Sequence, residues 1–130
     1  MKYVYNDGGR SNYFKGDAND CVVRAIAIAT DRDYKEVYNQ VKKIIGYTPR
    51  NSVKINDTKK VMKELGFKWE SKMSIGSGCT THLVESELPT DKIIVCKVSH
   101  HLTCIKYGVI NDTFDCSRDG SRCVYGYWYM

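Results

Sequence analysis

The amino-acid sequence predicts an α+β fold, with N-terminal helices packed on a C-terminal antiparallel β-sheet. In the first half, apolar residues recur at the helical spacing i, i+3, i+4 and i+7. In the second half, short runs rich in Val, Ile, Thr and aromatic residues follow one another. Helices and strands do not alternate, so a parallel βαβ arrangement is not expected. The 130 residues contain no linker-like stretch, and we therefore expect a single domain over residues 1–130.

The first expected helix covers residues 20–30 and is buried. Its run CVVRAIAIA is apolar almost all round, with Arg24 as its only charge, and such helices usually lie in a core. Asn19 or Asp17 could cap its N-terminus, because short polar side chains accept hydrogen bonds from the free N–H groups there. We expect Arg24 to form a structural ion pair with Asp20 or Asp17.

Two amphipathic helices are expected to follow. Asp33 and Glu36 have the spacing of a capping box, and the apolar periodicity after them continues up to Gly46, which ends the helix. A third helix is expected from about residue 57 to residue 65, with Gly66 as its stop signal.

Four strands are expected in the second half, over residues 92–98, 102–107, 109–114 and 123–129. Tyr107-Gly108 separates the second and third of these runs and is a plausible tight turn. Short strands joined by tight turns predict an antiparallel sheet.

Charge and hydropathy argue against several classes of protein. The chain has 20 Lys and Arg against 15 Asp and Glu, a net charge of +5, and its basic residues are scattered among acidic ones. Nucleic-acid-binding proteins cluster their basic residues, so no nucleic-acid partner is expected. No apolar run approaches the roughly 18 residues of a membrane span, and the N-terminus MKYVYNDGGRSNYF lacks the layout of a signal peptide. We expect a cytoplasmic protein with no membrane partner.

The six cysteines are expected to be free thiols, because the cytoplasm is reducing. Cys96 and Cys104 lie within expected strands and are assigned to the core. Cys116 and Cys123 flank the polar turn SRDGSR and are expected to be unpaired loop or strand-end thiols.

A zinc site is the competing interpretation of part of this set. Cys79 and His82 together with Cys96 and His100 have the composition of a Cys₂His₂ site. The spacing within these pairs is loose, and the second pair would lie along a strand. We therefore expect no metal and no other cofactor.

Cys21 differs from the other cysteines because it opens the buried helix. The free N–H groups and the dipole of a helix N-terminus stabilise a thiolate and could hold an oxyanion. A nucleophilic cysteine needs a base, and His101 at the start of a strand is the candidate, or His100 if the register shifts by one. Asp112 or Asp115 on the next strand could orient that base.

Three segments appear in the order found in papain-like cysteine peptidases: NDCVVRAI at 19–26, HLTCI at 101–105 and GVINDTFD at 108–115. The chain resembles this superfamily, and especially its small members encoded by tailed phages. The resemblance implies a papain-like fold and a cysteine hydrolase that cleaves an amide, isopeptide or related acyl bond. Cys21 would be the nucleophile, His101 the general base and Asp112 the orienting acid, with Asp115 as the alternative.

The resemblance has one departure from the family pattern. Papain carries an oxyanion-hole Gln six residues before its Cys, and that position here is Lys15. Asn19 or Asn12 could replace it, or the backbone N–H of Cys21 could act alone.

The resemblance implies a protein or peptide as the substrate, and for a phage-encoded member this would be a host protein. The alternative from another class is a non-catalytic interaction protein on the same scaffold, which would bind and modulate a host protein.

Overall fold

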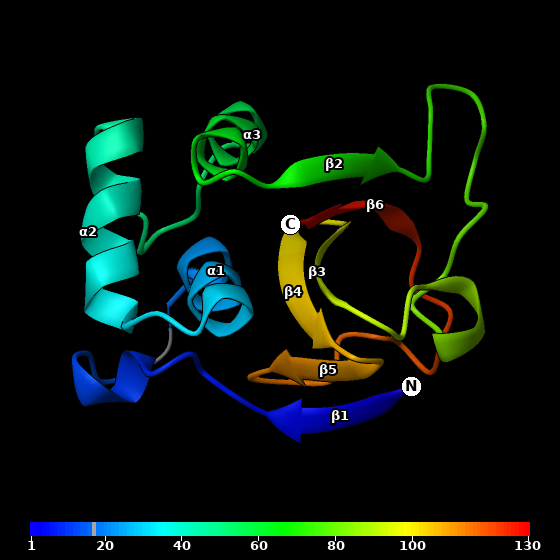
Figure 1. Cartoon of the computed structure of the whole chain (residues 1–130), viewed down its shortest axis with the longest axis horizontal. Coiled ribbons are helices and arrows are strands. Elements are labelled where there is room, and N and C mark those ends of the chain that lie inside the picture. Colours follow the sequence, from blue (N-terminus) through cyan, green and yellow to red (C-terminus); the bar gives the residue numbers. More distant parts are fainter. Residues whose placement is uncertain (17) are drawn as a thin grey trace.

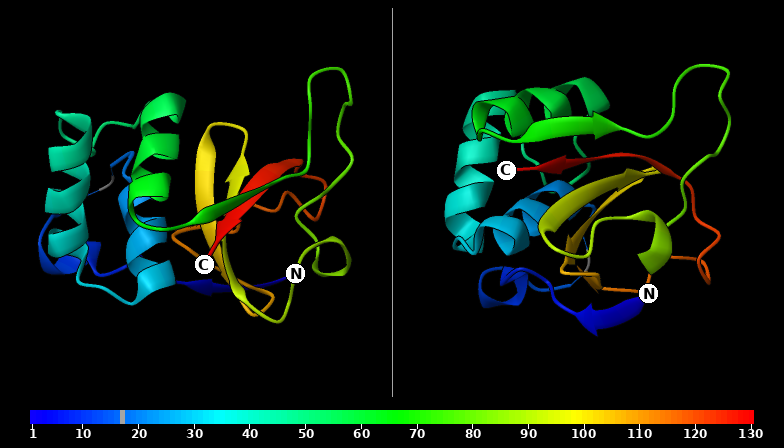
Figure 2. Two further views of the ribbon diagram at one scale, coloured as in Figure 1. Left: turned by 45° about the horizontal axis from the view of Figure 1, so that its top comes forward. Right: turned by 45° about the vertical axis from the view of Figure 1, so that its right-hand side comes forward.

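In the computed structural model, which describes residues 1–16 and 18–130, three α-helices lie on one side of a six-stranded sheet (Figure 1). The helices stay together on that side in both views of Figure 2. The α+β class is therefore confirmed.

The three helices are α1 (Cys21–Thr30), α2 (Tyr34–Ile45) and α3 (Ile55–Glu64). Asp33 is the N-cap of α2, as expected, and its carboxylate accepts a hydrogen bond from the backbone N–H of Glu36 at 3.2 Å. The Glu36 carboxylate pairs with Arg32, so the second bond of a capping box does not form. Gly46 ends α2 in the left-handed conformation. The start of α3 lies two residues before the expected one.

The prediction that Asn19 or Asp17 is the N-cap of α1 was wrong. The N-cap residue is Asp20, and its side chain makes no capping hydrogen bond. Its carboxylate is buried and used in other contacts, which are described with the site below. Of the two expected caps, Asn19 lies before the cap position, and Asp17 lies outside the described residues.

The sheet has the order β1-β5-β4-β3-β6-β2. Its strands are β1 (Lys2–Tyr5), β2 (Lys68–Ser71), β3 (Ile93–Val98), β4 (His101–Lys106), β5 (Val109–Asp112) and β6 (Val124–Tyr129). The four C-terminal strands, β3 to β6, were expected and pair antiparallel.

The sheet as a whole is not antiparallel, which corrects the expectation. β1 comes from the N-terminus and pairs with β5 in parallel. β2 adds to the opposite edge, next to β6. Both edge strands have four residues and are exposed along their length, so neither has the apolar alternation that marks a half-buried strand.

Two tight turns set the register of the central strands. Tyr107 and Gly108 both have positive φ, 49° and 81°, as a two-residue hairpin with the sheet's twist requires. This turn between β4 and β5 was expected. The turn from β3 to β4 contains His100 with φ 55°, and it fixes His101 as the first residue of β4.

Apolar side chains fill both faces of the sheet. One cluster joins the helices to the sheet and includes Val23, Ile26 and Cys104. The other lies on the opposite face and includes Ile94, Cys96 and Ile110. Cys96 and Cys104 are thus core residues, as expected. Among the described residues, no helix has the length and apolarity needed to cross a bilayer.

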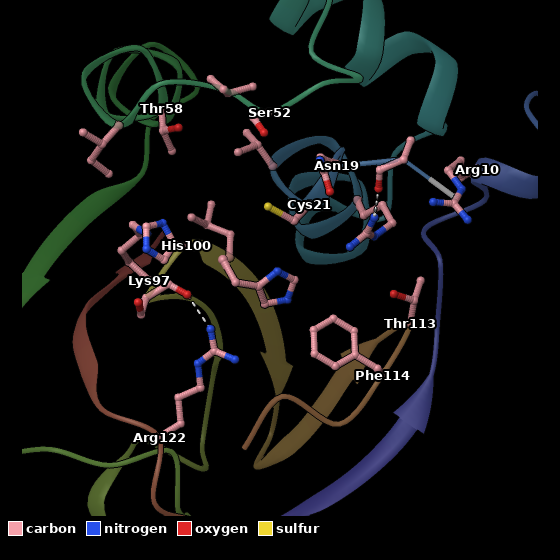
Figure 3. A pocket seen from close by; sticks show the side chains of 18 of the residues that line it. Arg10, Asn19, Cys21, Ser52, Thr58, Lys97, His100, Thr113, Phe114 and Arg122 are labelled. Atoms are coloured by element: carbon pink, nitrogen blue, oxygen red, sulfur yellow. Dashed lines mark hydrogen bonds between the residues drawn. The ribbon is translucent and has the colours of Figure 1, made fainter. Parts of the chain in front are cut away.

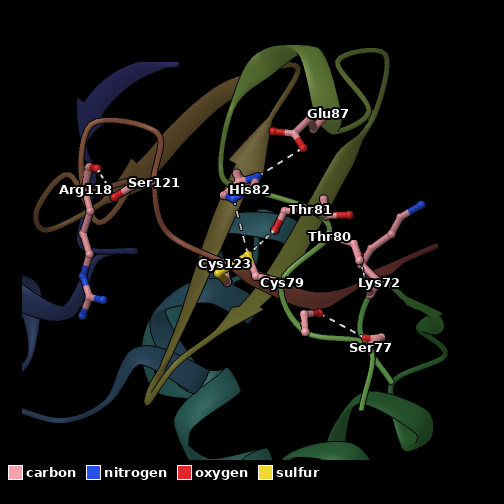
Figure 4. Close-up of a disulfide and its surroundings, with 11 residues drawn as sticks. Lys72, Ser77, Cys79, Thr80, Thr81, His82, Glu87, Arg118, Ser121 and Cys123 are labelled. Atoms are coloured by element: carbon pink, nitrogen blue, oxygen red, sulfur yellow. Dashed lines mark hydrogen bonds and ion pairs between the residues drawn. A yellow bond between two sulfur atoms is a disulfide. The ribbon is translucent and has the colours of Figure 1, made fainter. Parts of the chain in front are cut away.

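Two of the cysteines form a disulfide, which contradicts the expectation of free thiols. Cys79, in the segment between β2 and β3, is bonded to Cys123, just before β6 (Figure 4). The two residues are 44 apart in the chain. They meet because the 79–84 segment pairs with the start of β6, with Val124 N–H donating to the carbonyl of Thr81. Cys116 is an unpaired loop thiol, as expected, and it is buried on the second face of the sheet.

Candidate active site

Cys21 lies at the N-terminus of α1, where the turn between β3 and β4 and the C-terminal end of β5 also meet. It is partly exposed, whereas the other free cysteines, Cys96, Cys104 and Cys116, are buried. At this position the helix dipole and unpaired N–H groups favour a negative charge on the sulfur.

The structure brings His101 and Asp112 together. Their side chains are buried, and His101 Nε2 donates a hydrogen bond to Asp112 Oδ2 at 2.6 Å. The pairing of Cys104 with Asn111, continued by one residue, sets Asp112 opposite Thr103. His101 is therefore a diagonal neighbour of Asp112, within reach of long side chains on one sheet face.

The charges of Cys21, His101 and Asp112 stabilise one another. Burial raises the pKa of the Cys21 thiol, but the hydrogen bond and charge of His101 outweigh this, and the pKa lies below its usual value. Burial would lower the pKa of His101, but hydrogen bonds to Asp112, Cys116 and Cys21 raise it well above its usual value. Burial would raise the pKa of Asp112, and His101 instead lowers it. Each of these pKa shifts favours the charged form of its group: the thiolate of Cys21, the imidazolium of His101 and the carboxylate of Asp112.

The buried carboxylate of Asp20 lies at the start of α1, directly before Cys21 in the chain. Arg24 pairs with Asp20, as expected, and its guanidinium also lies 3.7 Å from Asp112 Oδ1. Arg10 Nη1 lies 3.4 Å from Asp20, and the Tyr34 hydroxyl donates to Asp20 at 2.5 Å. Asp20 thus links α1 and α2 to the carboxylate that holds His101.

Burial raises the pKa of the Tyr34 hydroxyl strongly, and the hydrogen bond to the Asp20 carboxylate raises it further. Sequence reasoning did not identify Tyr34 or Arg10 as part of this group. An Asp directly before the candidate nucleophile was the available signal, but its partners lie 10 and 14 residues away.

Several described residues that the sequence offered as alternatives make no hydrogen bond with the side chain of Cys21 or His101. Asp115 accepts hydrogen bonds from the backbone N–H and the hydroxyl of Ser117. Among the described residues it makes no hydrogen bond or ion pair with His101. His100 is exposed in its turn and has no hydrogen bond to a described carboxylate. Asn19 lies beside Cys21, whereas Asn12 does not line the cleft described below.

The expected alternative zinc set does not form among the described residues. Cys79 and His82 lie together, but their third neighbour is Cys123, the disulfide partner of Cys79. Cys96 and His100 belong to neither group of potential ligands. The second group is His101, Asp112 and Cys116, in which Cys116 had not been expected.

Cys21 and His101 line a cleft of about 920 Å³ (Figure 3). Its walls come from the start of α1, the segment before α3, the turn between β3 and β4, and the 113–122 segment. An extended acyl substrate could therefore reach the sulfur.

No protein-family model matches the chain, and neither the curated proteins nor the solved structures include a match.

Proposed function

We propose that this protein is a cysteine hydrolase of papain-like architecture that cleaves an amide, isopeptide or related acyl bond in a protein or peptide. One observation carries the proposal: Cys21, at the start of a buried helix, shares a cleft with a buried His101 that is hydrogen-bonded to Asp112. A nucleophile, a base and a group that orients the base are the minimum set for this chemistry.

The proposed reaction has two steps. The Cys21 thiolate attacks the acyl carbon, and the protonated His101 gives its proton to the leaving nitrogen as the C–N bond breaks. His101 then takes a proton from water, whose oxygen attacks the thioester carbon and releases Cys21. Asp112 keeps the imidazole ring oriented in both steps.

The developing oxyanion needs hydrogen-bond donors near Cys21. The backbone N–H of Cys21 is at the first position of α1, where helical N–H groups have no intrahelical partner. Asn19 lines the same cleft and its side chain makes no hydrogen bond with the described residues, so its amide is available as a second donor.

Cys21→Ala tests the proposal. With p-nitrophenyl acetate as an acyl probe, the native protein should release a burst of about one p-nitrophenol per chain as the acyl-enzyme forms. Cys21→Ala should abolish the burst and keep the circular dichroism spectrum. A burst that persists in Cys21→Ala would refute Cys21 as the nucleophile.

A non-catalytic interaction protein is the second candidate, and one observation favours it. Lys15, at the position of papain's oxyanion-hole Gln, does not line the cleft. This candidate predicts that Cys21 ionises at low pH yet forms no acyl-enzyme with p-nitrophenyl acetate. A burst at Cys21 would exclude it.

A further inference from the structure

The cleft beside Cys21 is lined by cations and by no described carboxylate. Its lining contains no Asp or Glu among the described residues, and besides the imidazolium of His101 it carries the Arg and Lys side chains of Arg10, Arg24, Lys97, Arg118 and Arg122. A cleft with one sign of charge attracts ligands of the opposite sign.

Two of these cations are already balanced within the protein. Arg10 and Arg24 both lie against the buried Asp20, and Arg24 also lies near Asp112. Lys97, Arg118 and Arg122 differ, because no described carboxylate lies within ion-pair distance of them. The unbalanced charge is therefore on the side of the cleft formed by β3 and the segment before β6.

Among Lys97, Arg118 and Arg122, Arg122 is the most buried. It is only 8% exposed, and its Nη2 donates to the carbonyl oxygen of Ser99. Its Nε is buried without a hydrogen-bond partner, and its Nη1 makes no hydrogen bond with the described residues. A guanidinium does not lose its proton in a protein, so Arg122 keeps a full charge with only neutral partners.

Lys97 lies next to Arg122 on the same side of the cleft (Figure 3). Its ammonium group is half-buried and donates to the carbonyl oxygen of Val98 at 2.6 Å. Burial lowers the pKa of Lys97, the Cys21 sulfur raises it, and the charge of Arg122 lowers it. Lys97 is thus close enough to both Cys21 and Arg122 for their charges to shift its pKa.

We propose that Lys97 and Arg122 form a carboxylate-binding subsite, so that the cleft prefers acyl substrates bearing a carboxylate close to the scissile bond. This inference rests on the proposed function, since it names the substrate class of the same cleft. A carboxylate could accept a charge-assisted hydrogen bond from Arg122 Nη1 and pair with the point charge of Lys97. The competing explanation is that both cations serve only to stabilise the Cys21 thiolate.

Alkylation by two reagents separates these explanations. Iodoacetamide is neutral and iodoacetate carries a carboxylate next to the reacting carbon. In both reactions the Cys21 sulfur bonds to that carbon as iodide leaves. A change in thiolate population alters both rates equally, whereas a carboxylate subsite alters only the ratio of the iodoacetate rate to the iodoacetamide rate.

We expect Arg122→Gln and Lys97→Gln each to lower this ratio about three- to tenfold at low salt, the size of one charge–charge interaction across a partly solvated site. Arg122→Lys should keep most of the ratio of the native protein. Lys43→Gln removes the same charge from an exposed position on α2, outside the cleft, and should leave the ratio unchanged. Raising the salt concentration should shrink the effect of Lys97→Gln.

An unchanged ratio in Lys97→Gln and Arg122→Gln would overturn the subsite. If Arg122→Gln fails to fold, as judged by circular dichroism, Lys97→Gln alone decides. The proposed function fails separately, if Cys21 reacts slowly with both reagents at pH 7 and ionises like an ordinary thiol.

Discussion

At the scale of single residues, the charge of the site depends on two buried groups, His101 and Asp112. Burial alone would make both His101 and Asp112 neutral. Their 2.6 Å hydrogen bond reverses this for both partners. The hydrogen bond and charge of His101 lower the pKa of the Cys21 thiol, so thiolate formation depends on His101.

His101→Gln should raise the apparent pKa of Cys21. The variant removes the charge and hydrogen bond that lower this pKa, and the burial that raises it remains. The rate of iodoacetamide labelling at pH 6 should fall at least about tenfold, because each pKa unit is a tenfold change in thiolate below the pKa. Mass spectrometry of the labelled protein over pH 5–10 measures this.

His100→Gln is the matched control, since it removes the neighbouring imidazole, which lies exposed in the turn before β4. It should leave the pH profile unchanged. A shift in His100→Gln equal to that in His101→Gln would contradict the assignment of the base.

Asp112→Asn should cost stability in a pH-dependent way. Folding lowers the pKa of Asp112 below its usual value. Its contribution to the free energy of unfolding is therefore fully present above the pKa that Asp112 has in the unfolded chain. That contribution is lost as the pH falls through the lower pKa of the folded protein. We expect a loss of about 1.5–3 kcal/mol in the free energy of unfolding at pH 6, the usual value of a hydrogen bond to a charged group. The difference between variant and native protein should shrink below pH 4.

Urea unfolding at several pH values measures this difference. Asp115→Asn, whose carboxylate bonds only to nearby Ser117, is the comparison and should cost less at pH 6. A larger loss in Asp115→Asn would contradict the role given to Asp112.

At the scale of elements, the edge strand β2 is held by close packing on β6. Gly126 lies opposite Ser71 in the register, and a Cβ at Gly126 would lie 2.4 Å from the ring of Trp69. Trp69 in turn contacts Trp128, with ring centroids 4.4 Å apart. The absence of a side chain at Gly126 is what lets Trp69 cover this edge.

Gly126→Ala should therefore displace Trp69 and weaken the pairing of β2 with β6. We expect a loss of about 1–3 kcal/mol in unfolding free energy, as for other overpacked sites, together with a red shift in tryptophan fluorescence. In a Trp69→Ala background the same change should cost much less, since the clashing ring is gone. Equal costs in both backgrounds would show that the clash is not the cause.

At the scale of the whole molecule, the Cys79–Cys123 disulfide joins the segment between β2 and β3 to the start of β6. Arg122 directly precedes Cys123, so this link also holds the segment that forms one wall of the cleft. A crosslink that closes a loop of 44 residues restricts the unfolded chain.

Reduction of this disulfide should lower the free energy of unfolding by about 2–4 kcal/mol. Urea unfolding with and without dithiothreitol measures the effect. The double variant Cys79→Ser/Cys123→Ser should be less stable and insensitive to dithiothreitol. If dithiothreitol destabilises the double variant by the same amount, the effect does not come from this bond.

Much of the fold could be predicted from local patterns, because they are repeated over several residues. The apolar run of α1, the N-cap of α2 and the β-rich runs of β3 to β6 each lie within one segment. The edge strands β1 and β2 could not be predicted, because they are short and exposed and are strands only through their partners.

The sequence by itself determined the three helices, the central strands and the residue types at the site, since helix starts and strand periods are local properties. Only the tertiary structure decided which groups meet: Asp112 and not Asp115 beside His101, Asp20 with Tyr34, and Cys79 with Cys123. These contacts join residues 11, 14 and 44 positions apart. Such pairs depend on how the strands and helices pack, and that information is spread over the whole chain.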